Sequence, residues 1–303
     1  MKKWLTEWLL WSVVLIWGAN YTIGKYGVVQ LSPLQFNTIR FVAAGPLLLL
    51  ATYLVEKSVK IDRKDFIRLV VVSLVGVICY QTLFMASIKY TSATNAALLI
   101  AMSPVFTGIF SVMAKQETFS WRVQIGSVIA FGGAAMVIIH RGDPGSAPDG
   151  QMLGDIMGLL AAISWGLYPV ITTPLLKTYS ALRVTTWSIV IGALILFPLV
   201  FSDLLSAAGT LTASTWSSLL YSAILVTAYG LVAWYVGISK IGSTKTMVYM
   251  YVTPLVASII AWLFIGETIQ AAQIMGGNII LAGLYMVKSS QYTQKRRQTA
   301  KGG

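Results

Sequence analysis

The chain is built from long runs of apolar residues separated by short polar segments. Each run has about 20 residues, the length a helix needs to cross the hydrocarbon core of a bilayer. Apolar and polar residues do not alternate along the runs, so the pattern favours helices over the strands of a membrane barrel. Ten spanning segments are predicted, at about 7–28, 33–55, 66–88, 92–114, 121–140, 154–176, 181–202, 214–237, 242–265 and 270–288.

Composition supports lipid as the solvent for much of the surface. Apolar residues make up 56% of the 303 residues and charged residues only 11%, against about 45–50% and about 25% in an ordinary soluble domain. This balance excludes a typical soluble enzyme and a disordered chain. Because Cys79 is the only cysteine, an internal disulfide is excluded as well.

The basic residues lie between the runs and in the tail. The net charge is +12, but this placement argues against nucleic acid as a partner. If the N-terminus is cytoplasmic, 18 of the 22 Lys and Arg residues fall on that side, as the positive-inside rule requires. We therefore expect a multi-pass protein of the cytoplasmic membrane with both termini in the cytoplasm.

Two halves of the chain resemble each other at an offset of 150 residues. The matched pairs are Thr94 and Thr244, Pro104 and Pro254, Glu117 and Glu267, Thr118 and Thr268, Gly126 and Gly276, Gly133 and Gly283, Met136 and Met286, and Val137 and Val287. Trp17 and Gly18 match Trp165 and Gly166 at 148. Five spans per half is an odd number, so the second copy is inserted upside down.

The predicted fold is therefore an all-α integral membrane protein with ten transmembrane helices in two inverted five-helix repeats. The repeats occupy 1–143 and 154–288, with an outer linker at 144–153 and a basic cytoplasmic tail at 289–303. Inverted repeats that meet at the midplane are the architecture of secondary transporters.

Several short segments carry a family resemblance. They are Ile16–Tyr21 (IWGANY), Ser32-Pro33, Arg40-Phe41, Tyr90–Ala96 (YTSATNA), Ser103–Phe106 (SPVF) with Glu117, Ile241–Thr244 (IGST), Thr253–Leu255 (TPL) and Gly266–Thr268 (GET). As a set they resemble the drug/metabolite transporter superfamily, EamA type, over nearly the whole chain. The resemblance implies ten helices in two inverted halves and movement of small metabolites, often amino acids or drugs, outward.

Polar and aromatic residues form stripes on predicted helices. In the first helix Trp17, Asn20 and Tyr21 share one face, and in the sixth Trp165 and Tyr168 repeat the arrangement. Such a stripe should face protein or water rather than lipid. We expect two facing walls of a substrate pathway; interhelical hydrogen bonding or an interfacial aromatic belt is the alternative.

Further pathway candidates lie on other predicted helices. They are Tyr80 and Gln81 in the third, Asn95 in the fourth, Tyr229 in the eighth and Tyr249 in the ninth. A packing role is the alternative for each of them.

Pro104 and Pro254 fall near the middle of the fourth and ninth runs. Each removes a hydrogen bond to the carbonyl four residues back, and the neighbouring Ser103 and Thr253 are placed to satisfy local backbone groups. Paired hinges and static kinks fit this pattern equally well.

Lys25 and Arg40 are the strong cations inside predicted spans. Snorkelling or structural pairing is expected for both, and contact of Arg40 with a substrate carboxylate is the alternative. Glu117 and Glu267 are interpreted as caps for the helix that follows each of them. No predicted span carries Asp or Glu near its middle, so coupling through a buried carboxylate is not supported.

These observations favour a secondary transporter that works by alternating access and moves a small metabolite outward. The expected substrate is an amino acid or related amphipathic compound, or a drug. No catalytic site, metal site or cofactor is predicted. The expected partners are a small-molecule substrate and the bilayer, and a homodimer through the glycine faces is left open. An integral-membrane enzyme and a non-transporting membrane partner or sensor are the alternatives.

Overall fold

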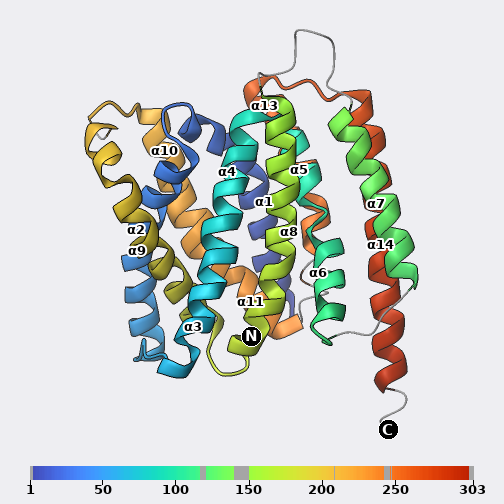
Figure 1. Cartoon of the computed structure of the whole chain (residues 1–303), viewed down its shortest axis with the longest axis horizontal. Coiled ribbons are helices and arrows are strands. Elements are labelled where there is room, and N and C mark those ends of the chain that lie inside the picture. The colour runs from blue at the N-terminus through green and yellow to red at the C-terminus, as the bar shows by residue number, and fades with distance from the viewer. Residues whose placement is uncertain are drawn as a thin grey trace.

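Long helices run side by side, close to one common direction (Figure 1). The computed structural model describes residues 3–116, 121–139, 150–207, 209–241, 246 and 248–299. Within these ranges the regular structure is helical and contains no strand. The helix class predicted from the apolar runs is therefore confirmed.

The elements, in chain order, are α1 (Lys3–Val28), α2 (Pro33–Glu56), α3 (Arg63–Val72), η1 (Ser73–Cys79), α4 (Tyr80–Tyr90), α5 (Ala93–Ile100), α6 (Ser103–Met113), α7 (Trp121–Ile139), α8 (Gln151–Leu176), α9 (Ala181–Ala207), α10 (Ala213–Tyr221), η2 (Ser222–Leu231), α11 (Val232–Ile241), η3 (Val248–Val252), α13 (Thr253–Ile265) and α14 (Ala271–Thr299). Several of them join end to end into continuous helices.

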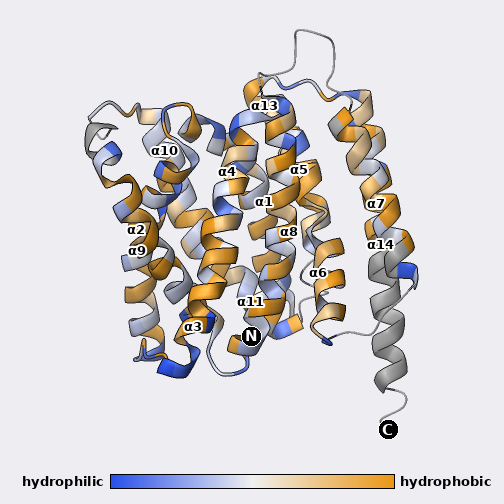
Figure 2. Ribbon diagram, viewed as in Figure 1, coloured by the Kyte–Doolittle hydropathy of each residue, from blue (hydrophilic) through white to orange (hydrophobic). Residues whose placement is uncertain are grey.

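Within the described residues, six helices are long and apolar enough to cross a membrane. They are Pro33–Glu56, Arg63–Tyr90, Ala93–Met113, Gln151–Leu176, Ala181–Asp203 and Ala213–Ile238. Shorter apolar helices cover Ile125–Val137, Thr253–Ile265 and Ala271–Met286. The helix α1 falls outside both groups; its sequence includes Glu7 and Lys25. Apolar residues fill the middle of the bundle (Figure 2).

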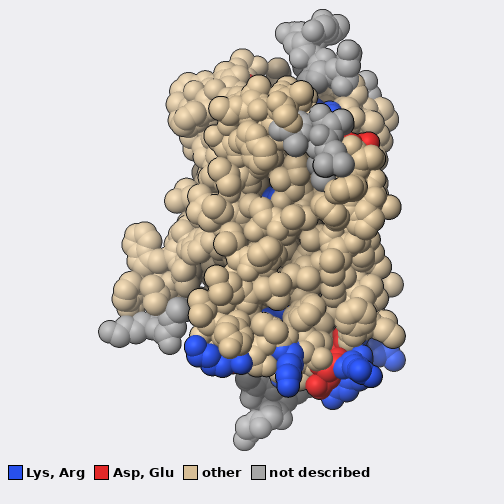
Figure 3. All heavy atoms as spheres, turned by 90° about the vertical axis from the view of Figure 1, so that its left-hand side faces the viewer, with Lys and Arg blue, Asp and Glu red and all other residues tan. Residues whose placement is uncertain are grey.

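Charged side chains gather at one end of the bundle. Seen from the side of α2 and α9, a broad band is almost free of charge, and Lys and Arg line the lower edge (Figure 3). Exposed basic residues at this end are Lys57, Lys60, Arg63, Lys64 and Arg68. We call it the basic end and the other the opposite end. The chain enters α1 and leaves α14 at the basic end (Figure 1).

Each helix of the first half packs against a helix of the second half. The pairs are α1 with α13, α10, η2 and α11; α2 with α9; α3 with α8 and α9; α4 and α6 with α8; α5 with α8 and α13; and α7 with α14. Most contacts that hold the bundle together therefore join segments far apart in the sequence.

Departures from α-helical geometry also recur between the halves. The helix Arg63–Tyr90 contains a π-helical segment, η1, and the helix Ala213–Ile238 contains another, η2. A wider π turn leaves backbone carbonyls available to other partners, and such segments are frequent at functional sites. Hydropathy predicted neither segment.

The glycines of α7 and α14 let these helices touch backbone to backbone. A Cβ added at Gly133 would lie 2.6 Å from the Gly276 carbonyl oxygen, and one at Gly283 would lie 2.4 Å from that of Gly126. The pairing runs antiparallel, since Gly126 meets Gly283 and Gly133 meets Gly276. These small faces are thus used within the chain rather than left open for a dimer seam.

The helix α14 continues to Thr299, eleven positions past the predicted end of the last span at 288. The predicted tail therefore begins as helix. Glu117 and most of the predicted linker lie outside the described residues.

Replacing Gly133 with Ala should destabilise the protein because the methyl group meets backbone atoms of α14 that cannot move independently. We expect a loss of about 1–3 kcal/mol, seen as a lower unfolding temperature in detergent. Gly132→Ala is the matched control, since nothing lies within 4 Å of its added Cβ. Equal unfolding temperatures for the two variants would contradict this packing.

Candidate functional site

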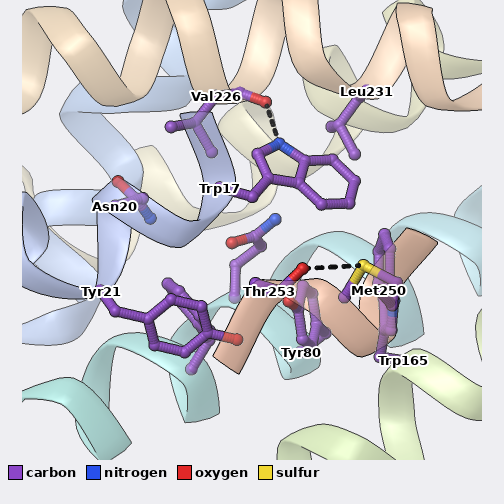
Figure 4. A pocket seen from close by; sticks show the side chains of 11 residues that line it. Trp17, Asn20, Tyr21, Tyr80, Trp165, Val226, Leu231, Met250 and Thr253 are labelled. Atoms are coloured by element: carbon purple, nitrogen blue, oxygen red, sulfur yellow. Dashed lines mark hydrogen bonds between the residues drawn. The ribbon is translucent and has the colours of Figure 1, made fainter. Parts of the chain in front are cut away.

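A small cavity lies inside the bundle between the two halves. Its lining comes from α1, α4, α8, η2, η3 and α13 and consists of Trp17, Asn20, Tyr21, Tyr80, Gln81, Phe84, Trp165, Val226, Leu231, Met250 and Thr253. Figure 4 shows these side chains converging from several helices. Six of the predicted pathway residues are therefore neighbours in space.

Aromatic rings form a continuous cluster around the cavity. Trp17 meets the edge of Trp165 with ring centroids 5.7 Å apart, and Tyr80 stacks on Trp165 at 4.5 Å. Tyr21 packs on Phe84 at 5.1 Å. The cluster thus joins α1 and α4 of the first half to α8 of the second, at spacings typical of favourable aromatic pairs.

The indole of Trp17 is held by the π-helical segment η2. Its Nε1 donates to the carbonyl oxygen of Val226 at 3.2 Å (Figure 4). Gly230 makes room for the ring, because a Cβ there would lie 2.4 Å from Trp17 Nε1. The π turn and the glycine together fix the position of this ring in the cavity wall.

Asn20 is fixed by a partner in the same segment. Ser222 Oγ donates to Asn20 Oδ1 at 2.9 Å, and both side chains are buried. The amide is therefore oriented with its oxygen toward Ser222.

Trp165 differs from Trp17 in its hydrogen bonding. Its side chain is 1% exposed, and its Nε1 has no partner among the described residues. A buried indole N–H without an acceptor is unusual, because buried polar groups are nearly always paired. The cavity wall thus offers a free donor.

The cavity is too small for an organic ligand as it stands. Its volume is about 20 Å³, room for about one water molecule, whereas ligand pockets are commonly about 300–1,000 Å³. The lining helices must therefore move apart before a metabolite can enter.

The remaining predicted pathway residues lie elsewhere. Tyr168 stacks behind Trp165 at 5.5 Å, and Tyr249 packs on Trp11 at 5.4 Å. Tyr229 is 37% exposed and shares a hydrogen bond with Ser12. None of the three lines the cavity, because the stripe pattern does not distinguish the first layer of a wall from the layer behind it or the outer face.

Asn95 belongs to a polar cluster at the opposite end of the bundle. Its amide donates to Asp155 Oδ1 at 3.2 Å, and its carbonyl oxygen accepts from Gln273 Nε2 at 2.7 Å. Lys25 donates to the Thr91 carbonyl oxygen at 2.9 Å. The structural pairing predicted for Lys25 is thus observed, whereas Asn95 lies away from the cavity.

Glu267 caps a different helix from the one predicted. Its carboxylate accepts from the backbone N–H groups of Ala93 and Thr94, each at 3.0 Å, so it stabilises the start of α5 in the other half rather than the helix that follows it. Spacing along the sequence could not show this, because the acceptor and donors are more than 170 residues apart.

The two prolines stand at helix starts rather than inside continuous helices. Pro104 is the second residue of α6, which follows a break at Ala101 and Met102, and Pro254 is the second residue of α13, which directly follows η3. Ser103 Oγ donates to the freed Ile100 carbonyl, as expected. Thr253 instead points its hydroxyl at the Met250 sulfur at 4.0 Å.

Arg40 does not snorkel, contrary to expectation. Its side chain is 0% exposed, and its guanidinium lies 4.9 Å from the centre of the Phe41 ring. Its three nitrogens have no hydrogen-bond partner among the described residues. Its helix α2 packs against α4, α9 and η2, and the side chain is buried within this packing.

Three apolar members of the lining were not predicted: Val226, Leu231 and Met250. They are ordinary residues in apolar runs; the first two belong to the π-helical segment η2 and the third to η3, neither of which hydropathy predicts. Within the part of the chain that the structure describes, no cluster of His, Cys, Asp and Glu could hold a metal ion.

Comparison with known proteins places this arrangement in context. The model of the EamA-like transporter family matches twice, at residues 4–139 and 152–289. An "Uncharacterized transporter" of Archaeoglobus fulgidus is 27% identical over 287 residues, which cover 95% of this chain and 98% of the relative. A "Probable terminal-alkyne amino-acid exporter" of Streptantibioticus cattleyicolor is 26% identical over 311 residues, 100% and 99% of the two chains.

A solved structure described as "Crystal structure of protein" superposes with a TM-score of 0.65 at 13% identity, covering 97% of this chain and 99% of the other. This likeness concerns the fold alone.

Replacing Glu267 with Ala should lower the unfolding temperature because two N–H groups at the start of α5 lose their acceptor. A lost cap costs about 0.5–2 kcal/mol. Glu267→Gln keeps one oxygen and should fall between the wild type and Glu267→Ala. The exposed neighbour Thr268→Ala is the control; a loss as large as that of Glu267→Ala would contradict the capping role.

Proposed function

We propose that this chain, which belongs to the EamA-like transporter family, is a secondary transporter that carries a small amphipathic metabolite outward across the cytoplasmic membrane by alternating access. Amino acids are the first substrate candidates, since one relative is named an amino-acid exporter. The observation that carries the proposal is the aromatic cavity enclosed between the two halves of a membrane-spanning bundle.

Two inverted five-helix repeats, 1–143 and 154–288, are part of the proposal. The family model matches one stretch in each half. Support also comes from recurring features: the π-helical segments η1 and η2, the breaks before Pro104 and Pro254, and the antiparallel glycine contact of α7 with α14. Halves of similar shape in opposite orientation have similar energies when the cavity opens to either side.

The cavity is closed toward the opposite end by the polar cluster there. Glu267 ties the end of α13 to the start of α5, and Lys25 ties α1 to the Thr91 carbonyl. Opening on this side requires these bonds to exchange for water, which is feasible because they lie at the membrane edge.

Toward the basic end the closure is made by different contacts. Thr107 Oγ1 donates to the Gly166 carbonyl at 2.9 Å, and Gln116 Nε2 donates to that of Val170 at 3.2 Å, so α6 and α8 are held together. A hollow of about 450 Å³ flanks this contact and is lined in part by Lys115, Thr173 and Lys177. In an outward carrier with a cytoplasmic basic end, substrate enters here.

Solute counterflow in proteoliposomes tests the transport activity. Vesicles loaded with an unlabelled amino acid should accumulate the same labelled compound, because a carrier exchanges substrate faster than it returns empty. The screen covers the common amino acids and cationic drugs, with and without a pH gradient. Counterflow of none of these compounds would count against a carrier.

The aromatic wall should be required for that exchange. Trp165→Ala removes the ring that contacts Trp17 and Tyr80, and we expect at least a tenfold lower counterflow rate with normal membrane insertion. Trp216→Ala removes an exposed tryptophan, 42% accessible, and should leave the rate near that of the wild type. Equal rates for both variants would argue against the cavity as the pathway.

Orientation is tested by cysteine labelling in a Cys79→Ala background. Ala114→Cys follows α6 and Thr268→Cys follows α13, the corresponding ends of the two repeats. An impermeant maleimide added to intact cells should label Thr268→Cys at once and Ala114→Cys only after permeabilisation. Labelling of both from the same side would refute the inversion.

A further inference from the structure

Arg40 is a buried cation whose hydrogen-bonding groups are unused. Its side chain is 0% exposed, and Nε and both terminal nitrogens lack a partner within the described structure. A guanidinium stays protonated in proteins and carries five N–H donors. The nearest feature is the Phe41 ring at 4.9 Å, which contacts the cation but accepts no conventional hydrogen bond.

Asn37 lies one turn before Arg40 on the same face of α2. It is also 0% exposed, and neither its amide nitrogen nor its amide oxygen has a partner among the described residues. Two polar side chains at i and i+3 are therefore left unsatisfied in the middle of the protein. Native interiors rarely tolerate this unless another molecule supplies the missing partner.

Arg40 and Asn37 lie on a helix that packs against the cavity wall. The helix α2 contacts α4 and η2, which both supply lining residues, and the charge of Arg40 interacts with Tyr80 of that lining. Tyr80 also stacks on Trp165, whose N–H is unpaired among the described residues. Tyr80 is thus a neighbour of two groups with unpaired donors, while the eleven side chains that line the cavity include no carboxylate.

We propose that Arg40 binds the carboxylate of the transported compound, with Asn37 and Trp165 as further hydrogen-bonding groups, so that the substrate is an amphipathic carboxylic acid such as an apolar amino acid. This inference rests on the proposed transport function. The planar guanidinium matches a carboxylate through two parallel hydrogen bonds. The aromatic wall then contacts the apolar part of the same molecule.

The same charge disfavours the other substrate class suggested by the sequence. A cationic drug without an acid group brings a second positive charge toward an uncompensated one in a medium of low dielectric, where repulsion is strong. An anion instead supplies a counter-charge to the buried guanidinium. The carrier therefore selects acids over amines.

Binding to the purified protein in nanodiscs tests this selectivity without requiring transport. The probes are phenylalanine, leucine and tryptophan, each compared with its amide and its decarboxylated amine. The readout is the rise in unfolding temperature with probe concentration. We expect the wild type to be stabilised by at least one amino acid and at least tenfold more weakly by the corresponding amide and amine.

Arg40→Gln should abolish the preference for the acid. Arg40→Lys keeps the charge but loses the paired hydrogen-bonding geometry, so it should retain a reduced preference for the acid. If Arg40→Gln does not fold, the comparison is made with Arg40→Lys. Lys89→Gln removes an exposed positive charge instead and should keep the wild-type preference.

The assignment would be overturned if the wild type bound acid and amide equally well or bound no acid at all. It would also be overturned if both Arg40 variants kept the wild-type preference for the acid. Counterflow of amines alone would leave the transporter standing and refute the acid site. Acid binding without counterflow of any compound would refute the transporter and leave the site.

Discussion

Lipid forms no hydrogen bonds, so the chain must satisfy its own polar groups wherever it crosses the membrane. The helices meet most of this demand through their backbone bonds. Where the backbone departs from α-helical geometry, side chains take over: Trp17 bonds the Val226 carbonyl within a π turn, and Ser103 bonds the Ile100 carbonyl freed by Pro104. The first of these bonds lies at the wall of the cavity.

A few buried polar side chains are exceptions to this rule, and their positions indicate where a substrate would bind. Arg40, Asn37 and Trp165 keep free polar groups although each is almost fully buried. An ion pair within the chain would have been a simple way to neutralise Arg40, and Asp155 shows that the bundle can bury a carboxylate with donors around it. Arg40 and Trp165 are both neighbours of Tyr80, whereas the hydrogen-bonded carboxylate of Asp155 lies at the opposite end of the bundle.

Much of the architecture could be predicted from the sequence, because apolar runs of spanning length permit little besides helices. The neighbourhood of Trp17, Tyr80 and Trp165 could also be predicted from their stripes. Contacts between segments far apart in the chain could not be predicted from the sequence. Glu267 was expected to cap the next helix and caps α5; Tyr229 matched the stripe pattern but lies on the outside, since periodicity identifies a face without naming its neighbour.

The tightness of the cavity has a consequence for the cell's energy supply. A volume of about 20 Å³ holds about one water molecule, too few to form a file of waters from one surface to the other. Within the described residues, this cavity therefore gives protons and small ions no continuous column of water, and so it does not dissipate the voltage across the membrane while the carrier is idle. A wide, permanently hydrated channel through the same helices would let ions leak across and dissipate that voltage.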